Sequence, residues 1–209
     1  MGGRTGMVGT ILSMIPGKRS RVRRTTLDRF IRMLQDAHAG ELAAAYAYRG
    51  HARSLRHGPI RTEITRIEGA EWHHRALVGA MMTEHGARPR RRREFLMAAI
   101  GRFFGALCFI PPRVGPMYAA GRLEASNVRQ YVQARDWALE LGYGDYEVGF
   151  DEMIAEEARH ETFFAEQSAP SRLVPIARAL LGWDPRAALA DQRSTVGREG
   201  RTDLIGEGR

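Results

Sequence analysis

Apolar residues recur along this chain at steps of three and four, the spacing of helices that turn one face to a core. Four long segments follow this pattern, at residues 26–55, 59–85, 114–141 and 145–167. Proline and glycine stand between them, and the alternation of β-branched residues that marks strands appears nowhere. We therefore predict an all-α fold in which four long helices pack as a bundle.

Two further helices complete this outline. Phe95–Ile110 is an apolar run that ends at two prolines, and it predicts an extra helix between the second and third long ones. Arg172–Leu181 predicts a short C-terminal helix. Thr25 or Thr26 is expected to cap the first long helix at its N-terminus.

The composition fits a single domain with tails. Apolar residues make up 44% of the 209, which is enough for a core. Cys108 is the single cysteine, which excludes a disulfide framework, a Cys-rich metal site and a rubredoxin-type electron module, and which indicates a reducing, cytoplasmic setting. We expect three parts: a basic, flexible segment at 1–25, the bundle at 26–182 and a polar tail at 183–209.

Positive charge is concentrated in two places. The net charge is +8, residues 1–25 carry no acid, and five arginines precede the apolar run, Arg88 and Arg90–Arg93. Such clusters either attract phosphate or anionic lipid headgroups, or are solvated surface. No basic patch is interleaved with aromatic residues, so a nucleic-acid partner is not expected. No segment reaches the ~20 apolar residues of a transmembrane helix.

The strongest chemical signal is a repeated Glu-x-x-His. Glu71 with His74, and Glu157 with His160, each lie in the middle of an apolar stripe on one of the long helices. A chain with 16 glutamates and 7 histidines would carry about half of one such pair by chance, so a single pair would be weak. Two pairs, both centred in their stripes, are a much stronger indication of a metal site.

The other two long helices carry one glutamate each in the same register, Glu41 and Glu124. Four buried carboxylates would repel one another, and two divalent cations would neutralise them. One Glu from each of two helices and Glu-x-x-His from each of the others is the ligand plan of di-iron and di-manganese bundles. The expected ligands are Glu41, Glu71, His74, Glu124, Glu157 and His160. The alternative is that these residues face solvent on differently phased helices.

Several neighbouring residues have two interpretations. His38 either supports the metal site or is structural, and His73 is read as a non-ligand because it points about 100° away from His74. Tyr48 and Tyr131 lie near the depth of the ligands. Three further acids either hold the outer nitrogens of the histidines or face solvent. These are Glu68, Glu156 and Glu161.

The motifs around the expected ligands resemble those of the demethoxyubiquinone hydroxylase family, ferritin-like di-iron enzymes of ubiquinone synthesis. The likeness covers roughly residues 26–167, and the chain departs from the family pattern at Ala37, which stands where the family has Asp, and at Ala125, which replaces a second Glu. The segments that carry it are His38-Ala39-Gly40-Glu41-Leu42, Glu71-Trp72-His73-His74, Leu123-Glu124-Ala125-Ser126 with Tyr131, and Glu156-Glu157-Ala158-Arg159-His160.

The resemblance implies a ferritin-like bundle holding two iron ions, with manganese as the other candidate. It implies a monooxygenase that hydroxylates a quinone-type aromatic ring with O₂ and a reductant, and no catalytic residue beyond the metal ligands is assigned. The rival functions are hydroxylation of a tRNA base, peroxide reduction, and iron binding or storage. An oligomer is compatible with each of them.

The apolar run at 95–110 leaves three interpretations open. It is either a helix that lies in a membrane interface with the arginines on anionic headgroups, a contact between chains, or a helix that covers the core. The family resemblance favours membrane contact, with the protein peripheral on the inner face of the cell membrane and a hydrophobic, quinone-like substrate entering there.

Overall fold

The computed structural model describes residues 16–110 and 112–191, and within them it contains helices and no strand. This confirms the all-α class and the bundle of four long helices with two additional ones. The expected flexibility of residues 1–15 and of the tail beyond 191 falls outside the described residues. The helices, in chain order, are α1 (Pro16–Ser54), α2 (Pro59–Glu84), α3 (Arg91–Leu107), α4 (Val114–Leu141), the 3₁₀ turn η2 (Gly144–Tyr146), α5 (Glu147–Ser168) and α6 (Val174–Leu181).

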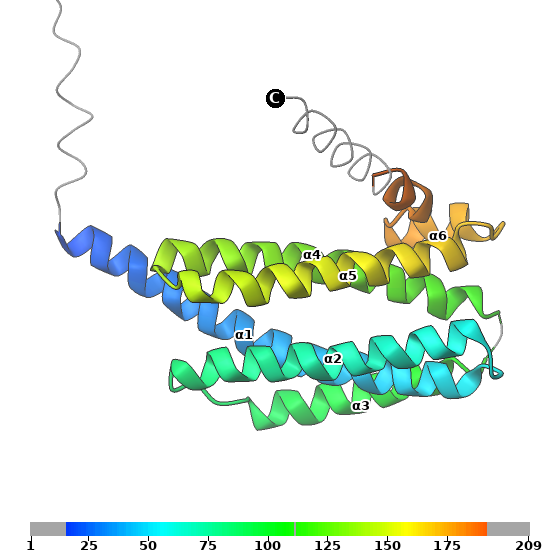
Figure 1. Ribbon diagram of the computed structural model, residues 1–209, viewed down its shortest axis with the longest axis horizontal. Coiled ribbons are helices and arrows are strands. Elements are labelled where there is room, and N and C mark those ends of the chain that lie inside the picture. Colours follow the sequence, from blue (N-terminus) through cyan, green and yellow to red (C-terminus); the bar gives the residue numbers. More distant parts are fainter. Residues whose placement is uncertain (1–15, 111, 192–209) are drawn as a thin grey trace, which may run out of the picture.

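The bundle consists of two antiparallel helix pairs, α1 with α2 and α4 with α5 (Figure 1). The pairs meet mainly where α1 contacts α4, and α3 lies along α1 on the side away from α4. Two apolar clusters fill the interior, one around Phe30, Tyr131 and Phe150 and the other around Ile64 and Phe164. The expected metal ligands lie between these clusters, so the bundle holds them in a layer closed at both ends.

The first helix begins earlier than expected. Helix α1 starts at Pro16, which suits the first position of a helix because proline lacks an amide hydrogen that would need a partner. The predicted cap at Thr25 or Thr26 is wrong. Thr25 instead donates its hydroxyl to the carbonyl of Arg21 one turn back, at 2.9 Å, which is the contact of a threonine inside a helix. The helical part of the chain therefore includes residues 16–25.

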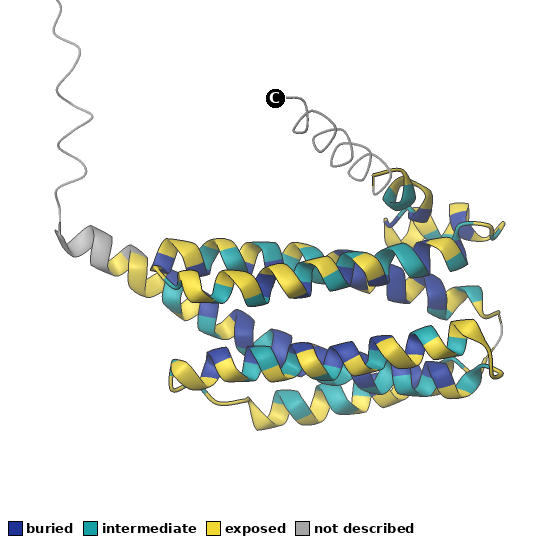
Figure 2. Cartoon of the chain, viewed as in Figure 1, coloured by how far each residue is buried: buried dark blue, intermediate teal, exposed yellow. Residues whose placement is uncertain are grey.

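Helix α3 packs on α1 through glycines. A Cβ at Gly101 would lie 2.8 Å from the Cα of Ala43, and one at Gly105 would lie 3.1 Å from the Cα of Gly50, so the two backbones are in close contact. The guanidinium of Arg102 covers the ring of Tyr46 at 3.8 Å. The large apolar side chains of α3 consequently point away from α1, and Figure 2 shows how little of this helix is buried.

Ion pairs fix the first turn of α3. Glu94 accepts from Arg75 at 2.7 Å and lies 2.8 Å from His38 Nδ1, which ties α3 to α2 and α1. Arg93 pairs with Asp36 at 2.9 Å. His38 is therefore committed to anchoring α3, which is the structural one of its two interpretations. None of the described helices combines the length and the apolar character needed to cross a lipid bilayer.

The packed part of the chain extends beyond the predicted bundle limit at residue 182. Trp183 is buried, its ring lies against Gly121 on α4, and its Nε1 donates to Glu161 at 2.9 Å. Tyr118 donates its hydroxyl to the carbonyl of Trp183, and residues 185–191 form another helical turn. The polar tail therefore starts later than expected, because the ring of Trp183, just after the end of α6, packs into the space beside Gly121 where a larger residue would have a side chain.

Candidate metal centre

Six polar side chains from four helices meet in the middle of the bundle. Helices α1 and α4 contribute one glutamate each, and α2 and α5 contribute a Glu-x-x-His each. All six are buried, with exposed fractions of 0–3%. The residues are those expected from the sequence: Glu41, Glu71, His74, Glu124, Glu157 and His160. Their register in the apolar stripes thus does point them inward, and the interpretation as exposed residues on misphased helices is wrong.

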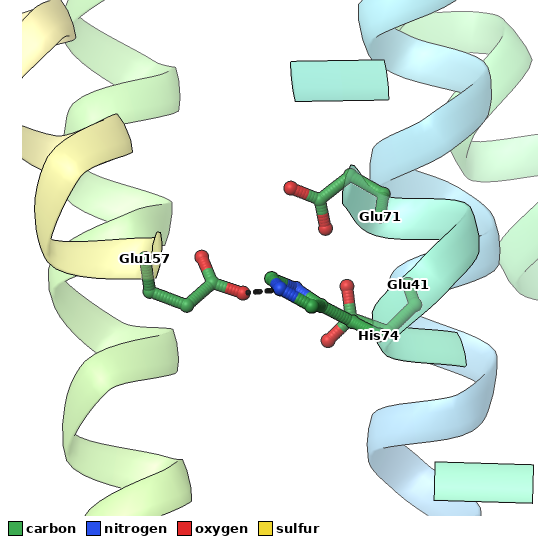
Figure 3. Close-up of side chains that lie close together, drawn as sticks. All are labelled: Glu41, Glu71, His74 and Glu157. Atoms are coloured by element: carbon green, nitrogen blue, oxygen red, sulfur yellow. Dashed lines mark ion pairs between the residues drawn. The ribbon is translucent and has the colours of Figure 1, made fainter. Parts of the chain in front are cut away.

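The six residues form two groups of four that share two members. Glu41 and His74 belong to one group, Glu124 and His160 to the other, and Glu71 and Glu157 to both. In each group the candidate ligand atoms all lie within 4.8 Å of one another. Figure 3 shows the first group, with Glu157 reaching from α5 toward His74 on α2. A carboxylate shared by two groups has one oxygen for each, which is the arrangement that bridges two cations.

Several of these polar atoms have no hydrogen-bond partner within the described part of the chain. Both oxygens of Glu71, both ring nitrogens of His74 and of His160, and Oε2 of Glu41 are buried without one. The closest approach, 3.2 Å from His74 Nδ1 to Glu157 Oε1, is at the outer limit of the hydrogen-bond range, and neither atom has a hydrogen-bond partner in the ranges that the structure describes. Buried polar atoms are nearly always satisfied, so this concentration of unsatisfied ones indicates a missing partner.

The carboxyl groups carry strongly perturbed pKa values. Burial raises the pKa of Glu71 and of Glu124 well above its usual range, and the charge of Glu157 raises both further. The pKa of Glu41 is also raised by burial. Glu157 differs, because favourable interactions with the neighbouring Glu124 and the two histidines overcome its burial and lower its pKa. Without metal, burial thus disfavours the charged form of Glu41, Glu71 and Glu124, and bound cations would reverse this preference.

Two tyrosines cross the centre from one helix pair to the other. Tyr48 on α1 donates its hydroxyl to Oε1 of Glu124 on α4, and Tyr131 on α4 donates to Oε1 of Glu41 on α1. Each tyrosine stands seven residues after the glutamate of its own helix, two turns along the same face. Each helix pair thus supplies a hydrogen-bond donor for the glutamate of the opposite pair, which orients both carboxylates.

One of the expected outer partners of the histidines is present. Oε2 of Glu156 lies 3.5 Å from His74 Nε2, and its other oxygen accepts from Arg66 at 2.8 Å. Burial opposes the ionisation of Glu156, but the hydrogen bond from Arg66 and the charges of the histidines lower its pKa. This arrangement leaves Nδ1 of His74 facing the centre, as a metal-binding imidazole with an outer carboxylate partner would require.

Other candidates lie outside the centre. His73 points to the surface and approaches Glu152 at 3.2 Å, in agreement with its interpretation as a non-ligand. Glu68 accepts from Arg49 at 2.7 Å, and Glu161 accepts from Trp183, so neither serves a histidine of the centre. The sequence reasoning missed Asn127, whose side-chain amide donates to Glu124 Oε2 at 3.1 Å.

Comparison with known proteins finds one similar family. The model of a family described as "Ubiquinone biosynthesis protein COQ7" matches residues 25–119. Over these residues, a little under half of the chain, the protein is similar to the COQ7 family. No curated protein and no solved structure matched the chain. The COQ7 match spans α2 and α3 entirely, with most of α1 and the beginning of α4.

The COQ7 match includes three of the six residues of the centre, Glu41, Glu71 and His74. The other three lie beyond residue 119, on the helices that face them in the bundle. The COQ7 family contains hydroxylases of ubiquinone biosynthesis, which are oxidoreductases. The six side chains fit a pair of divalent cations, because their unsatisfied atoms converge and two of the carboxylates reach both groups.

Proposed function

We propose that this protein is a di-iron monooxygenase that hydroxylates a quinone-type aromatic ring with O₂ and a reductant. The observation that carries the proposal is the pair of four-residue groups that share Glu71 and Glu157 at the buried centre of a chain similar to the COQ7 family. Carboxylate-rich sites with one imidazole per metal suit iron and also manganese. Loaded with Fe(II), the centre would supply O₂ activation, with one oxygen atom entering the ring and the other leaving as water.

The chain's own residues provide the ligands and the surroundings of the reaction. Glu71 and Glu157 would serve both cations, while Glu41 with His74 and Glu124 with His160 would complete the two positions. Tyr48 and Tyr131 hold the single glutamates in orientation. The apolar clusters on either side of the ligand layer keep water from the centre and strengthen its electrostatic interactions.

Metal analysis and product formation test this proposal together. Anaerobic loading should give about two irons per chain in a coupled pair by Mössbauer spectroscopy, as the paired ligand plan requires. The loaded protein, given O₂, a reductant and a demethoxyquinone analogue, should then form the hydroxylated ring. Glu157→Gln should abolish both results. Glu152→Gln is the matched control, because it makes the same change at an exposed position of α5.

The possible outcomes separate the rival functions. A coupled iron pair without ring hydroxylation would refute the substrate assignment, and rapid consumption of peroxide would then favour a peroxidase. Turnover of a modified tRNA base would favour the RNA hydroxylase. A very large shell in size-exclusion chromatography, with many irons per chain, would favour storage.

We further propose that the outer face of α3 lies on an anionic membrane from which the substrate enters. The side chains that α3 and the following turn expose are large and apolar, with Phe95, Phe103 and Phe109 each exposed by 60% or more. Arg91 and Arg92 are exposed at the start of the same helix, where anionic headgroups would meet them. Because α3 contacts α1 through Gly101 and Gly105, its large apolar side chains do not cover the core, which disfavours the interpretation of α3 as a core-covering helix.

Flotation with liposomes tests the membrane proposal. The protein should float with vesicles that contain anionic lipid and float less with neutral ones. Phe103→Asp with Phe104→Asp should abolish flotation. Val148→Asp introduces one such charge at an exposed apolar position of α5 and should leave flotation unchanged. Equal flotation of the α3 variant and the wild type would refute the role of this face, and a stable dimer lost in the same variant would indicate a contact between chains.

A further inference from the structure

The two metal positions have unlike surroundings, although the two helix pairs follow one plan. On α1 the residue three places after Glu41 is Ala44, and on α4 the residue three places after Glu124 is Asn127. A step of three keeps a side chain on the same face of a helix, one turn further along. It is also the step that separates glutamate from histidine on α2 and α5. Asn127 therefore lies where its side-chain amide can reach the metal centre. Its counterpart on α1, Ala44, has only a methyl group.

Both contacts of Asn127 fall on the same metal position. Its amide nitrogen lies 3.1 Å from Glu124 Oε2 and 3.4 Å from Glu157 Oε2. Oε2 is the oxygen of Glu157 that lies 3.8 Å from His160 Nδ1, whereas Oε1 lies 3.2 Å from His74 Nδ1. The amide of Asn127 thus links Glu124 to Oε2 of Glu157, the oxygen of the shared glutamate that lies on the side of His160.

The two single glutamates differ in how firmly they are held. Glu124 accepts Tyr48 on Oε1 and Asn127 on Oε2, so both of its oxygens are fixed. Glu41 accepts Tyr131 on Oε1, and its Oε2 has no hydrogen-bond partner among the described residues. A carboxylate held at both oxygens has a set plane before the cation arrives, whereas one held at a single oxygen can turn.

We propose that Asn127 is a positioning residue that makes the two metal positions unequal, so that the Glu124/His160 position depends on it and the Glu41/His74 position does not. This inference rests on the proposed metal centre. The ligand class is a first-row divalent cation. The first cation should enter the Glu124/His160 position, where the carboxylates are already oriented.

Cobalt titration of single-position variants tests this directly. His74→Ala removes the imidazole of one position and His160→Ala that of the other, so each variant retains one complete position. Asn127→Leu, similar in size but without donors, is then added to each. Co(II) binding, followed anaerobically by its visible absorption, should weaken about 10- to 100-fold in the His74→Ala background, the usual effect of losing an outer partner. In the His160→Ala background it should stay within about threefold, as for uncoupled changes.

Controls separate positioning from folding. Gln133→Leu makes the same change at an exposed amide on α4 and should leave both affinities unchanged. Asn127→Ala repeats the test with a smaller side chain in case leucine does not fit, and circular dichroism checks that each variant folds. An equal loss in both backgrounds, or no loss in either, would overturn the role of Asn127. A wild-type chain that takes up no Co(II) would overturn the metal centre itself, whereas two bound cobalts with no effect of Asn127 would overturn only this inference.

Discussion

The glycine contact between α1 and α3 makes a sharp prediction about stability. A Cβ at Gly101 would lie 2.8 Å from the Cα and 2.9 Å from the carbonyl carbon of Ala43, whereas ordinary contact begins at 3.4 Å. The carbonyl oxygen of Ala43 would lie closer still. Backbone atoms of a helix cannot rotate away as a side chain can, so α3 would have to retreat by more than about 0.6 Å to reach ordinary contact. Gly101→Ala should therefore loosen the whole helix from α1.

The expected size of the effect follows from two opposing contributions. Overpacking of a tight contact costs about 1–3 kcal/mol. Replacing a glycine inside a helix by alanine favours folding by about 0.5–1 kcal/mol. These ranges leave a net destabilisation of about 0–2.5 kcal/mol, and we expect the upper half of that range for Gly101→Ala because the obstructing atoms belong to a helix backbone. Gly69→Ala on α2 should instead stabilise the protein by about 0.5–1 kcal/mol, because nothing lies within 4 Å of a Cβ placed there.

Urea unfolding of both variants, with chelator present throughout, would measure these differences. The two midpoints should move in opposite directions at an unchanged slope, which would show that stability and not compactness has changed. Gly101→Ala should also expose α3 to limited proteolysis before the rest of the bundle. If Gly101→Ala were as stable as Gly69→Ala, the close approach of α3 to α1 would be refuted.

Three further predictions follow from the centre and its supports. Glu71 and Glu124 have raised pKa values in the metal-free fold, so their contribution to its stability is complete below the usual carboxyl value of 4.5 and is lost as pH rises through the raised values. The lowered pKa of Glu157 affects stability only at acidic pH. The melting temperature without metal should thus fall as pH rises above the usual carboxyl value of 4.5, and the gap to the metal-loaded protein should widen; a constant gap in calorimetry would contradict this. Tyr131→Phe should weaken metal binding about 10-fold or more in an equilibrium titration, because it frees Glu41, and unchanged affinity would exclude an orienting role. Trp183→Ala should cost about 3 kcal/mol in chemical unfolding, since a buried indole and its bond to Glu161 are lost, whereas a cost near zero would show that this residue belongs to the tail.

Helical periodicity was enough to locate the centre. A stripe at steps of three and four defines one face of a helix, so a glutamate in mid-stripe must point into the bundle wherever the helix packs. The same reasoning could not foresee Asn127, because one polar residue beside a stripe is indistinguishable from a solvated one until the facing helix is in place. Its only signal was the step of three from Glu124, which matches the spacing within Glu-x-x-His.

Helix ends and close contacts were harder to predict, for physical reasons that differ from case to case. Thr25 suits a helix cap, but within a longer helix its hydroxyl bonds one turn back. Gly101 and Gly105 read as neutral positions in an apolar run, and their role appears only when the backbone of α1 lies against them. Trp183 follows a helix-ending Gly182 and looked like the start of a tail, because the gap it fills is formed by a different helix.

The hydrogen bonds of Tyr48 and Tyr131 form only when the two helix pairs of the bundle are correctly aligned. Neither helix pair supplies the tyrosine hydroxyl for its own single glutamate, since the hydroxyl for Glu41 comes from α4 and the one for Glu124 comes from α1. Sliding one pair past the other by a single helical turn, about 5.4 Å, would part both tyrosines from their carboxylates at once and separate Glu157 from His74. Misaligned halves would therefore lose all of these contacts together, so that the contacts that prepare the site for metal also disfavour an incorrectly assembled bundle.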